Sequence, residues 1–124
     1  MKRRNKFYLE PHIRHMVDSI IMTYPYKKLE YENCIFKSKE QDGQPRGNQT
    51  SDSTFNDVNA RLKIYSRFLE PVELALDEIP EEYRQGLINK IAFGQREPDY
   101  AADITWKRYR RRFRYYVAMY ADLI

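Results

Sequence analysis

Cysteine and long apolar runs are scarce in this chain, and each shortage excludes a class of protein. The 124 residues contain one cysteine, Cys34, which excludes an intramolecular disulfide and a cysteine-based zinc site. No apolar run approaches the roughly 20 residues that span a bilayer, and no apolar stretch follows the basic start as it would in a signal peptide. We therefore expect a soluble protein of the reducing cytoplasm.

Catalytic motifs are lacking as well. The four glycines are scattered and form no phosphate-binding loop, and no nucleophile–base pair or paired-carboxylate motif stands out. His12 and His15 share a helix face, but no third metal ligand of a suitable type lies nearby in the sequence. We expect that the protein is not an enzyme and uses no cofactor or metal.

Acidic residues are missing between Ile104 and Ala121, where the cations of the chain concentrate. The net charge is +4, yet residues 7–103 are net acidic and both ends of the chain are basic. Six of the 22 basic residues fall within eight positions: Lys107, Arg108, Arg110, Arg111, Arg112 and Arg114. Such asymmetry favours directed electrostatic docking.

The same segment has the period of an amphipathic helix. At about 100° per residue, one face carries Trp106, Tyr109, Phe113, Val117 and Tyr120, and the basic residues point away from it, with Arg110 at the margin. A helix of this kind suits a polyanion, and double-stranded nucleic acid is the first candidate. The alternatives are RNA, an anionic membrane surface, and an ordinary solvated face of a helical bundle.

Proline and a polar stretch divide the first half of the chain. Apolar residues at helical spacing predict a helix from Pro11 to Thr23, ended by Pro25, and a shorter helix from Tyr26 to Phe36. Residues 38–54 carry no apolar side chain and predict a flexible linker. This gives an N-terminal helical segment (1–37), a polar linker (38–54) and a helical DNA-binding domain (55–124).

The second half begins with a long apolar seam. Beyond the N-cap residues Ser51–Ser53, apolar residues recur at spacings of four and three: Val58, Leu62, Tyr65, Leu69, Val72, Leu76 and Ile79. This seam predicts helix packing within a bundle, with a dimeric coiled coil as the alternative. Pro71 predicts a kink or break near Arg67–Glu70, and Pro80 ends the helix.

Two further helices complete the expected fold. One runs from Glu81 to about Phe93 and stops at Gly94, and the last begins after the polar stretch 95–102 with Asp103 or Thr105 as its cap. The acidic residues between Glu70 and Glu82 either contact a basic partner or form a solvated helix face. No segment alternates as a strand, so we expect an all-α fold, a small bundle with a long kinked central helix.

Three segments together resemble a known family. They are Thr23-Tyr24-Pro25 before a lysine-rich helix start, the long helix opened by Ser51–Thr54 and closed by the run from Leu76 to Arg84, and Ile104-Thr105 leading into Arg108–Phe113 and Val117-Ala118. Their order and separation resemble the RinA/ArpU-type phage transcriptional activators of Gram-positive bacteria. The latter two segments also look like the fourth region of bacterial sigma factors.

The resemblance implies a helix-turn-helix whose second helix begins at Thr105. It implies that Trp106, Lys107, Arg108, Arg111 and Arg112 face the major groove of DNA, where arginine matches guanine. The family carries a supporting helix before this one, whereas here the corresponding residues 95–103 are few and include Pro98. They form either one abbreviated turn from Pro98 or a variant geometry.

These observations together predict a sequence-specific regulator of transcription that binds double-stranded DNA. The resemblance implies a phage or prophage activator of late genes in the cytoplasm of a bacterial host. The acidic stretch between Glu70 and Glu82 suggests host RNA polymerase as a further partner, and the apolar seam suggests a second copy of the chain. The expected DNA-binding residues are Thr105, Trp106, Lys107, Arg108, Arg110, Arg111, Arg112 and Arg114. The alternative function is a phage packaging or assembly adaptor that docks the basic helix on an acidic protein.

Overall fold

The computed structural model describes the backbone of residues 5–41 and 58–124, and the side chains of 5–33 and 58–124. Over these residues the chain is all-helical and contains no strand, as the sequence predicts. The predictions for the Cys34 side chain, for the N-caps Ser51–Ser53 and for residues 42–54 of the linker lie outside the described residues.

The first helix, α1, runs from Pro11 to Gln41 with Pro25 inside it. The prediction of two helices separated at Pro25 is therefore wrong, and residues 38–41 belong to the helix rather than to the linker. Proline removes one backbone hydrogen bond and crowds the preceding turn, which usually ends a helix. Here side chains on both sides of Pro25 pack against the same central helix, so packing outweighs that local cost.

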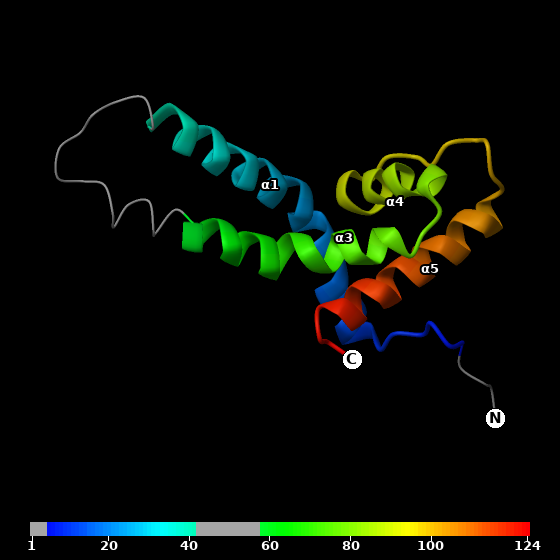
Figure 1. Cartoon of the computed structure of the whole chain (residues 1–124). Helices are drawn as coiled ribbons and strands as arrows, with labels where there is room; N and C mark the ends of the chain where they lie inside the picture. The colour runs from blue at the N-terminus through cyan, green and yellow to red at the C-terminus, as the bar shows by residue number, and fades with distance from the viewer. Residues whose placement is uncertain (1–4, 42–57) are drawn as a thin grey trace.

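The contacts around Pro25 show how α1 continues. Ile21 and Tyr24 are buried just before it, and Tyr31, two turns later, lies against Tyr65 with ring centroids 6.1 Å apart. Figure 1 shows α1 changing direction between its blue first turns and its cyan end. A bend at an interior proline is the expected response of a helix that does not break.

The central helix is continuous from residue 58 to Asp77 but changes its winding before Pro71. Residues 58–64 are α-helical, Tyr65–Leu69 form the π-helical turn η1, and Glu70–Asp77 form α3. Within η1 the Glu70 N–H donates to the Tyr65 carbonyl, five residues back. The distortion predicted from Pro71 thus takes the form of a π-turn, a frequent cause of a local kink.

The predicted seam of the central helix is buried only in its second half. Leu69, Val72 and Ile79 are buried and Leu76 is half-buried, whereas Val58 is 39% and Leu62 is 59% exposed. Figure 1 shows why: the first half of this helix lies beside the second half of α1, away from the remaining helices. The predicted helical bundle is formed around the second half of the central helix, where α4 and α5 also pack against it.

The last two helices close the core around α3. Helix α4 spans Glu81–Phe93 and α5 spans Asp103–Tyr120. All the described helices contribute to one cluster of buried residues: Val17, Ile21, Tyr24, Ile64, Leu69, Val72, Ala75, Ile79, Leu87, Ile88, Trp106, Phe113, Val117 and Ala118. The N-terminal segment therefore shares its core with the C-terminal helices.

Helix α4 ends at Gly94, as predicted. Gly94 has the left-handed φ of 67°, and backbone N–H groups of Gly94 and Gln95 donate to the carbonyls of Lys90 and Asn89. This is the usual way a glycine terminates a helix. Residues 94–102 then contain no helix, so the supporting helix of a standard helix-turn-helix is not formed there.

Helix α5 begins without a side-chain cap. Its N-cap residue is Ala102, and Asp103 lies in the first turn, where a carboxylate favours the positive end of the helix. The prediction that Asp103 or Thr105 is the cap is therefore wrong. The Thr105 and Trp106 N–H groups both donate to the Ala102 carbonyl.

Two of the acidic residues of the central helix accept hydrogen bonds from tyrosines. Tyr24 of α1 donates to Glu73 Oε1 at 3.3 Å, and Tyr120 of α5 donates to Glu78 Oε1 at 2.8 Å. These carboxylates tie α3 and its C-terminal end to both neighbouring helices.

Candidate nucleic-acid interface

The predicted amphipathic pattern of α5 is confirmed. Trp106, Phe113 and Val117 are buried, and Tyr109 and Tyr120 are half-buried. The basic residues between them lie on the sides of the helix that face solvent or other segments of the chain. Their environments differ, and the differences decide which of them a ligand can reach.

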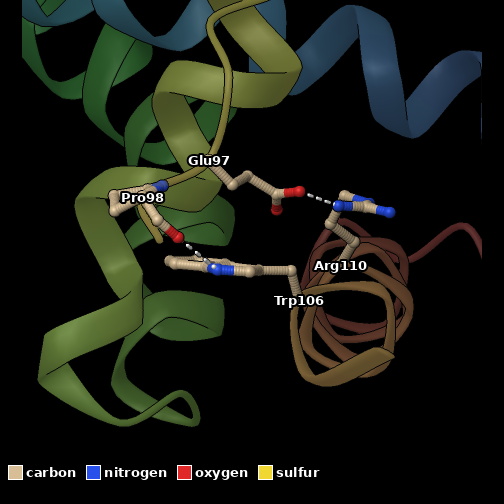
Figure 2. A network of polar contacts seen from close by, with 4 residues as sticks. All are labelled: Glu97, Pro98, Trp106 and Arg110. Atoms are coloured by element: carbon tan, nitrogen blue, oxygen red, sulfur yellow. Dashed lines mark hydrogen bonds and ion pairs between the residues drawn. The ribbon is translucent and has the colours of Figure 1, made fainter. Parts of the chain in front are cut away.

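Trp106 does not face outward. Its side chain is 1% exposed, and its indole N–H donates to the Pro98 carbonyl at 3.0 Å (Figure 2). The residue implied to reach the major groove is thus part of the core. The apolar period of the helix predicts this buried position correctly, whereas the exposed position implied by the family resemblance is wrong for Trp106.

An aromatic cluster around Trp106 holds residues 94–102 against α4 and α5. Tyr83 packs edge-on against Trp106 at 5.1 Å and stacks on Tyr109 at 4.5 Å between ring centroids. Tyr100 lies 5.6 Å from Trp106, and its hydroxyl donates to the Glu82 carbonyl. The segment between the two helices is therefore fixed by ring packing rather than by its own secondary structure.

Arg110 and Arg114 are bound to carboxylates of the protein itself. Arg110 pairs with Glu97, as Figure 2 shows, and Arg114 Nε donates to Asp18 Oδ1 at 2.7 Å. The two arginine side chains are only 23% and 17% exposed. The absence of acidic residues between Ile104 and Ala121 therefore does not leave Arg110 and Arg114 without partners, because Glu97 and Asp18 come from other segments of the chain.

Arg112 is partly covered by an aromatic ring. Its guanidinium carbon lies 5.3 Å from the centroid of Phe7 and 6.0 Å from that of Tyr109. Its Nε is buried and has no hydrogen-bond partner among the described residues. The charge of Arg112 is therefore not neutralised by a carboxylate in the part of the chain that the structure describes.

Lys107, Arg108 and Arg111 remain exposed. With Ile104, which is 64% exposed, they recur at i, i+3, i+4 and i+7 and form one stripe over two turns. We call these four residues the exposed stripe of α5. Thr105 lies beside it in the first turn and is half-buried.

The N-terminal segment 5–10 lies against α5 next to this stripe, which the sequence did not predict. The Phe7 ring contacts Tyr115 edge-on, with centroids 5.2 Å apart, and lies 6.1 Å from Tyr116. The one sequence signal was an aromatic residue, Phe7, directly after a basic start. Nothing in its spacing named α5 as its neighbour.

Two hollows open where this segment meets α5. The first, of about 350 Å³, is lined by Phe7, Tyr8, Leu9, Arg14, Lys107, Arg110, Arg111 and Arg114. The second, of about 320 Å³, is lined by Asn5, Phe7, Ile104, Lys107, Arg108, Arg111 and Arg112. Among the described residues no carboxylate lines either hollow. Both are suited to anions.

Within residues 5–33 and 58–124, no three histidine, cysteine, aspartate or glutamate side chains gather as a metal site would require. In the same part of the chain, none of the helices combines the length and apolar character needed to cross a bilayer. No protein-family model, curated protein sequence or solved structure matches the chain.

Proposed function

We propose that the chain is a sequence-specific regulator of transcription that binds double-stranded DNA through the exposed stripe of α5. The observation that carries the proposal is the stripe itself: three solvent-facing cations, Lys107, Arg108 and Arg111, with no carboxylate in the adjoining hollows among the described residues. The phage late-gene setting implied by the family resemblance is part of the same proposal.

The stripe supports both parts of DNA recognition. Arginine and lysine neutralise phosphates and, in the major groove, match the acceptors of guanine. Ile104 at the start of the stripe offers an apolar contact of the kind that thymine methyl groups accept. Since no short helix precedes α5, we propose a docking pose that differs from the standard helix-turn-helix.

Fewer phosphates are neutralised in this geometry than six clustered cations suggest. Arg110 and Arg114 are paired within the protein, so the exposed cations near the stripe among the described residues are Lys6, Arg14, Lys107, Arg108 and Arg111. If about four phosphates are contacted, the logarithm of the binding constant should fall with the logarithm of salt at a slope of roughly −3 to −4. Fluorescence anisotropy with labelled duplex DNA over a salt series measures this slope.

A matched pair of double variants tests the location. Lys107→Ala with Arg111→Ala should weaken duplex binding at least tenfold and reduce the salt slope by about two. Lys63→Ala with Arg67→Ala removes the same charges at the same i, i+4 spacing from an exposed face of the central helix. Equal losses in the two double variants would mean that only net charge matters, and the proposal would fail.

Sequence preference needs its own experiment. Selection of bound fragments from a random duplex pool should return an enriched motif, and half-site symmetry in that motif would indicate a dimer. A second measurement is competition between duplex DNA and an acidic protein partner for the basic helix. If no motif is enriched and duplex DNA does not displace the acidic partner, the adaptor function replaces the regulator.

A further inference from the structure

The N-terminal segment contributes side chains to both hollows on the basic surface of α5. Phe7, Lys107 and Arg111 line both hollows, and Phe7 is the one of these three that comes from the N-terminal segment. Arg14, from the first turns of α1, lines the first hollow together with Lys107 and Arg111. Cations from two separate elements therefore converge on one space.

The second hollow takes its positive charge from α5 alone. It is lined by Arg108 and Arg112 in addition to the shared Lys107 and Arg111. Arg112 is held by the Phe7 ring rather than by a carboxylate, because its guanidinium lies over that ring and over Tyr109. An arginine stacked on aromatic rings keeps its charge available to a ligand.

We propose that the two hollows bind two neighbouring phosphate groups of one nucleic-acid strand, and that Phe7 is the positioning residue that sets them apart. This inference rests on the proposed function and adds to it a part of the interface that lies outside α5. Arg14 would contact one phosphate, Arg108 and Arg112 the other, and Lys107 with Arg111 would lie between them. No carboxylate lines either hollow among the described residues, although Glu97 and Asp18 already pair with Arg110 and Arg114 of the first.

The inference predicts two single-site effects on duplex binding. Arg14→Ala should weaken binding about three- to tenfold and reduce the salt slope by about one, as expected for one lost phosphate contact. Phe7→Ala removes no charge but releases both the segment and Arg112, so it should weaken binding by a similar factor. Phe7→Tyr keeps the ring and should restore the wild-type affinity, and Arg67→Ala serves as the charge-matched control.

Free pyrophosphate tests whether the two hollows bind phosphate groups that do not belong to a nucleic acid. Titration of the full chain with pyrophosphate, followed by the NMR signals of arginine Nε–H groups, should shift signals in the wild type and shift them less in Arg14→Ala and Phe7→Ala. Competition of pyrophosphate with duplex DNA would show that both occupy the same hollows.

The outcomes separate the two proposals. If wild-type protein binds duplex DNA but Arg14→Ala and Phe7→Ala behave like Arg67→Ala, the two-hollow inference is overturned and DNA binding by the stripe stands. If duplex DNA does not bind while pyrophosphate binds in a Phe7-dependent way, the phosphate site stands and the regulator proposal fails. Binding of neither ligand overturns both.

Discussion

Arg114 and Asp18 lie 96 positions apart in the chain, and their ion pair joins α5 to α1. Arg110 is joined in the same way to Glu97, 13 positions earlier. The segment that looks uniformly basic in the sequence thus contains structural cations, one cation held by aromatic rings and three exposed ones. Helical spacing gave the buried face of α5 correctly, but no local pattern reveals which distant carboxylate meets which arginine.

Substitution of Asp18 tests whether Arg114 stabilises the fold rather than binding DNA. Asp18→Asn removes the charge that pairs with the largely covered Arg114, so the free energy of unfolding should fall by about 1 kcal/mol. Duplex DNA affinity should stay the same or rise slightly, because a negative charge near the basic surface is lost. Urea denaturation and anisotropy measure the two effects.

The control for Asp18→Asn is an exposed ion pair. Glu30→Gln breaks the Lys27–Glu30 pair at 3.1 Å on the surface of α1 and should change stability by less than about 0.5 kcal/mol. A clear loss of DNA affinity in Asp18→Asn, at protein concentrations where it is folded, would contradict the division of roles.

Gly86 is required by the close approach of Trp106. A Cβ at this position would lie 2.6 Å from Cη2 and 3.0 Å from Cζ3 of that indole. Gly86→Ala should therefore lower the free energy of unfolding by roughly 1–3 kcal/mol, despite the better helix propensity of alanine. Because Trp106 is the one tryptophan of the chain, its fluorescence should change in the folded variant.

Gly94→Ala is the matched comparison for Gly86→Ala. A Cβ at Gly94 meets no atom within 4 Å, but the backbone φ of 67° strains any residue other than glycine. We expect a loss of about 1 kcal/mol and unchanged tryptophan fluorescence. If Gly94→Ala changes the Trp106 emission and Gly86→Ala does not, Gly86 is not the residue that accommodates the indole.

At the scale of elements, the sequence predicts the type of each element better than its ends. The period of α5, the stop of α4 at Gly94 and the distortion before Pro71 follow from local chemistry, and the structure has all three. The break at Pro25 does not occur, because the contacts of Tyr24 and Tyr31 with other elements favour a continuous α1. Proline sets a local preference, whereas the length of a helix is settled by what both of its halves pack against.

Replacing Pro25 tests this balance. Pro25→Ala restores a backbone donor inside α1 and removes the crowding of the preceding turn, so stability should rise by about 1–3 kcal/mol with higher helix content by circular dichroism. Pro80→Ala changes the N-cap position of α4, where proline lies outside the helix, and should give no comparable gain. A loss of stability in Pro25→Ala would show that the bend of α1 is needed to seat Tyr24.

At the scale of the whole molecule, Tyr24 links α1 to α3 across the core. Burial and then the neighbouring Glu73 carboxylate raise the pKa of Tyr24 well above its usual value of about 10. The folded protein therefore keeps this proton at pH values where the unfolded chain loses it. The stabilisation is fully present below about pH 10 and is lost as pH rises above it.

Tyr24→Phe should weaken this alkaline dependence. At pH 7 the variant loses one hydrogen bond and should be destabilised by about 1 kcal/mol, whereas its urea midpoint should fall less steeply than that of the wild type between pH 9 and 11. Some dependence should remain, because neighbouring carboxylates also raise the pKa of Tyr65 and Tyr120. The exposed Tyr26→Phe should follow the wild-type profile, and a parallel profile for Tyr24→Phe would refute the linkage.

The all-helical class and most elements of the molecule follow from apolar periods and turn residues. The placement of residues 5–10 on α5 does not, because it depends on one aromatic ring meeting Tyr115 and Tyr116, more than a hundred positions away. The same holds for the residues between α4 and α5, which look like a loop in sequence and are ordered by Tyr83 and Trp106.

The position of residues 5–10 also has a practical consequence for anyone handling the protein. Asn5 and Phe7 line the same hollows as Lys107 and Arg111, so a bulky or charged group attached to this segment would compete with any polyanion there. The C-terminal residues 121–124 follow the end of α5 at Tyr120, about three turns beyond Lys107 and Arg111 along the helix (Figure 1). Reporters and immobilisation chemistry therefore belong after Ile124, and results obtained with an N-terminal fusion should be compared with the cleaved protein.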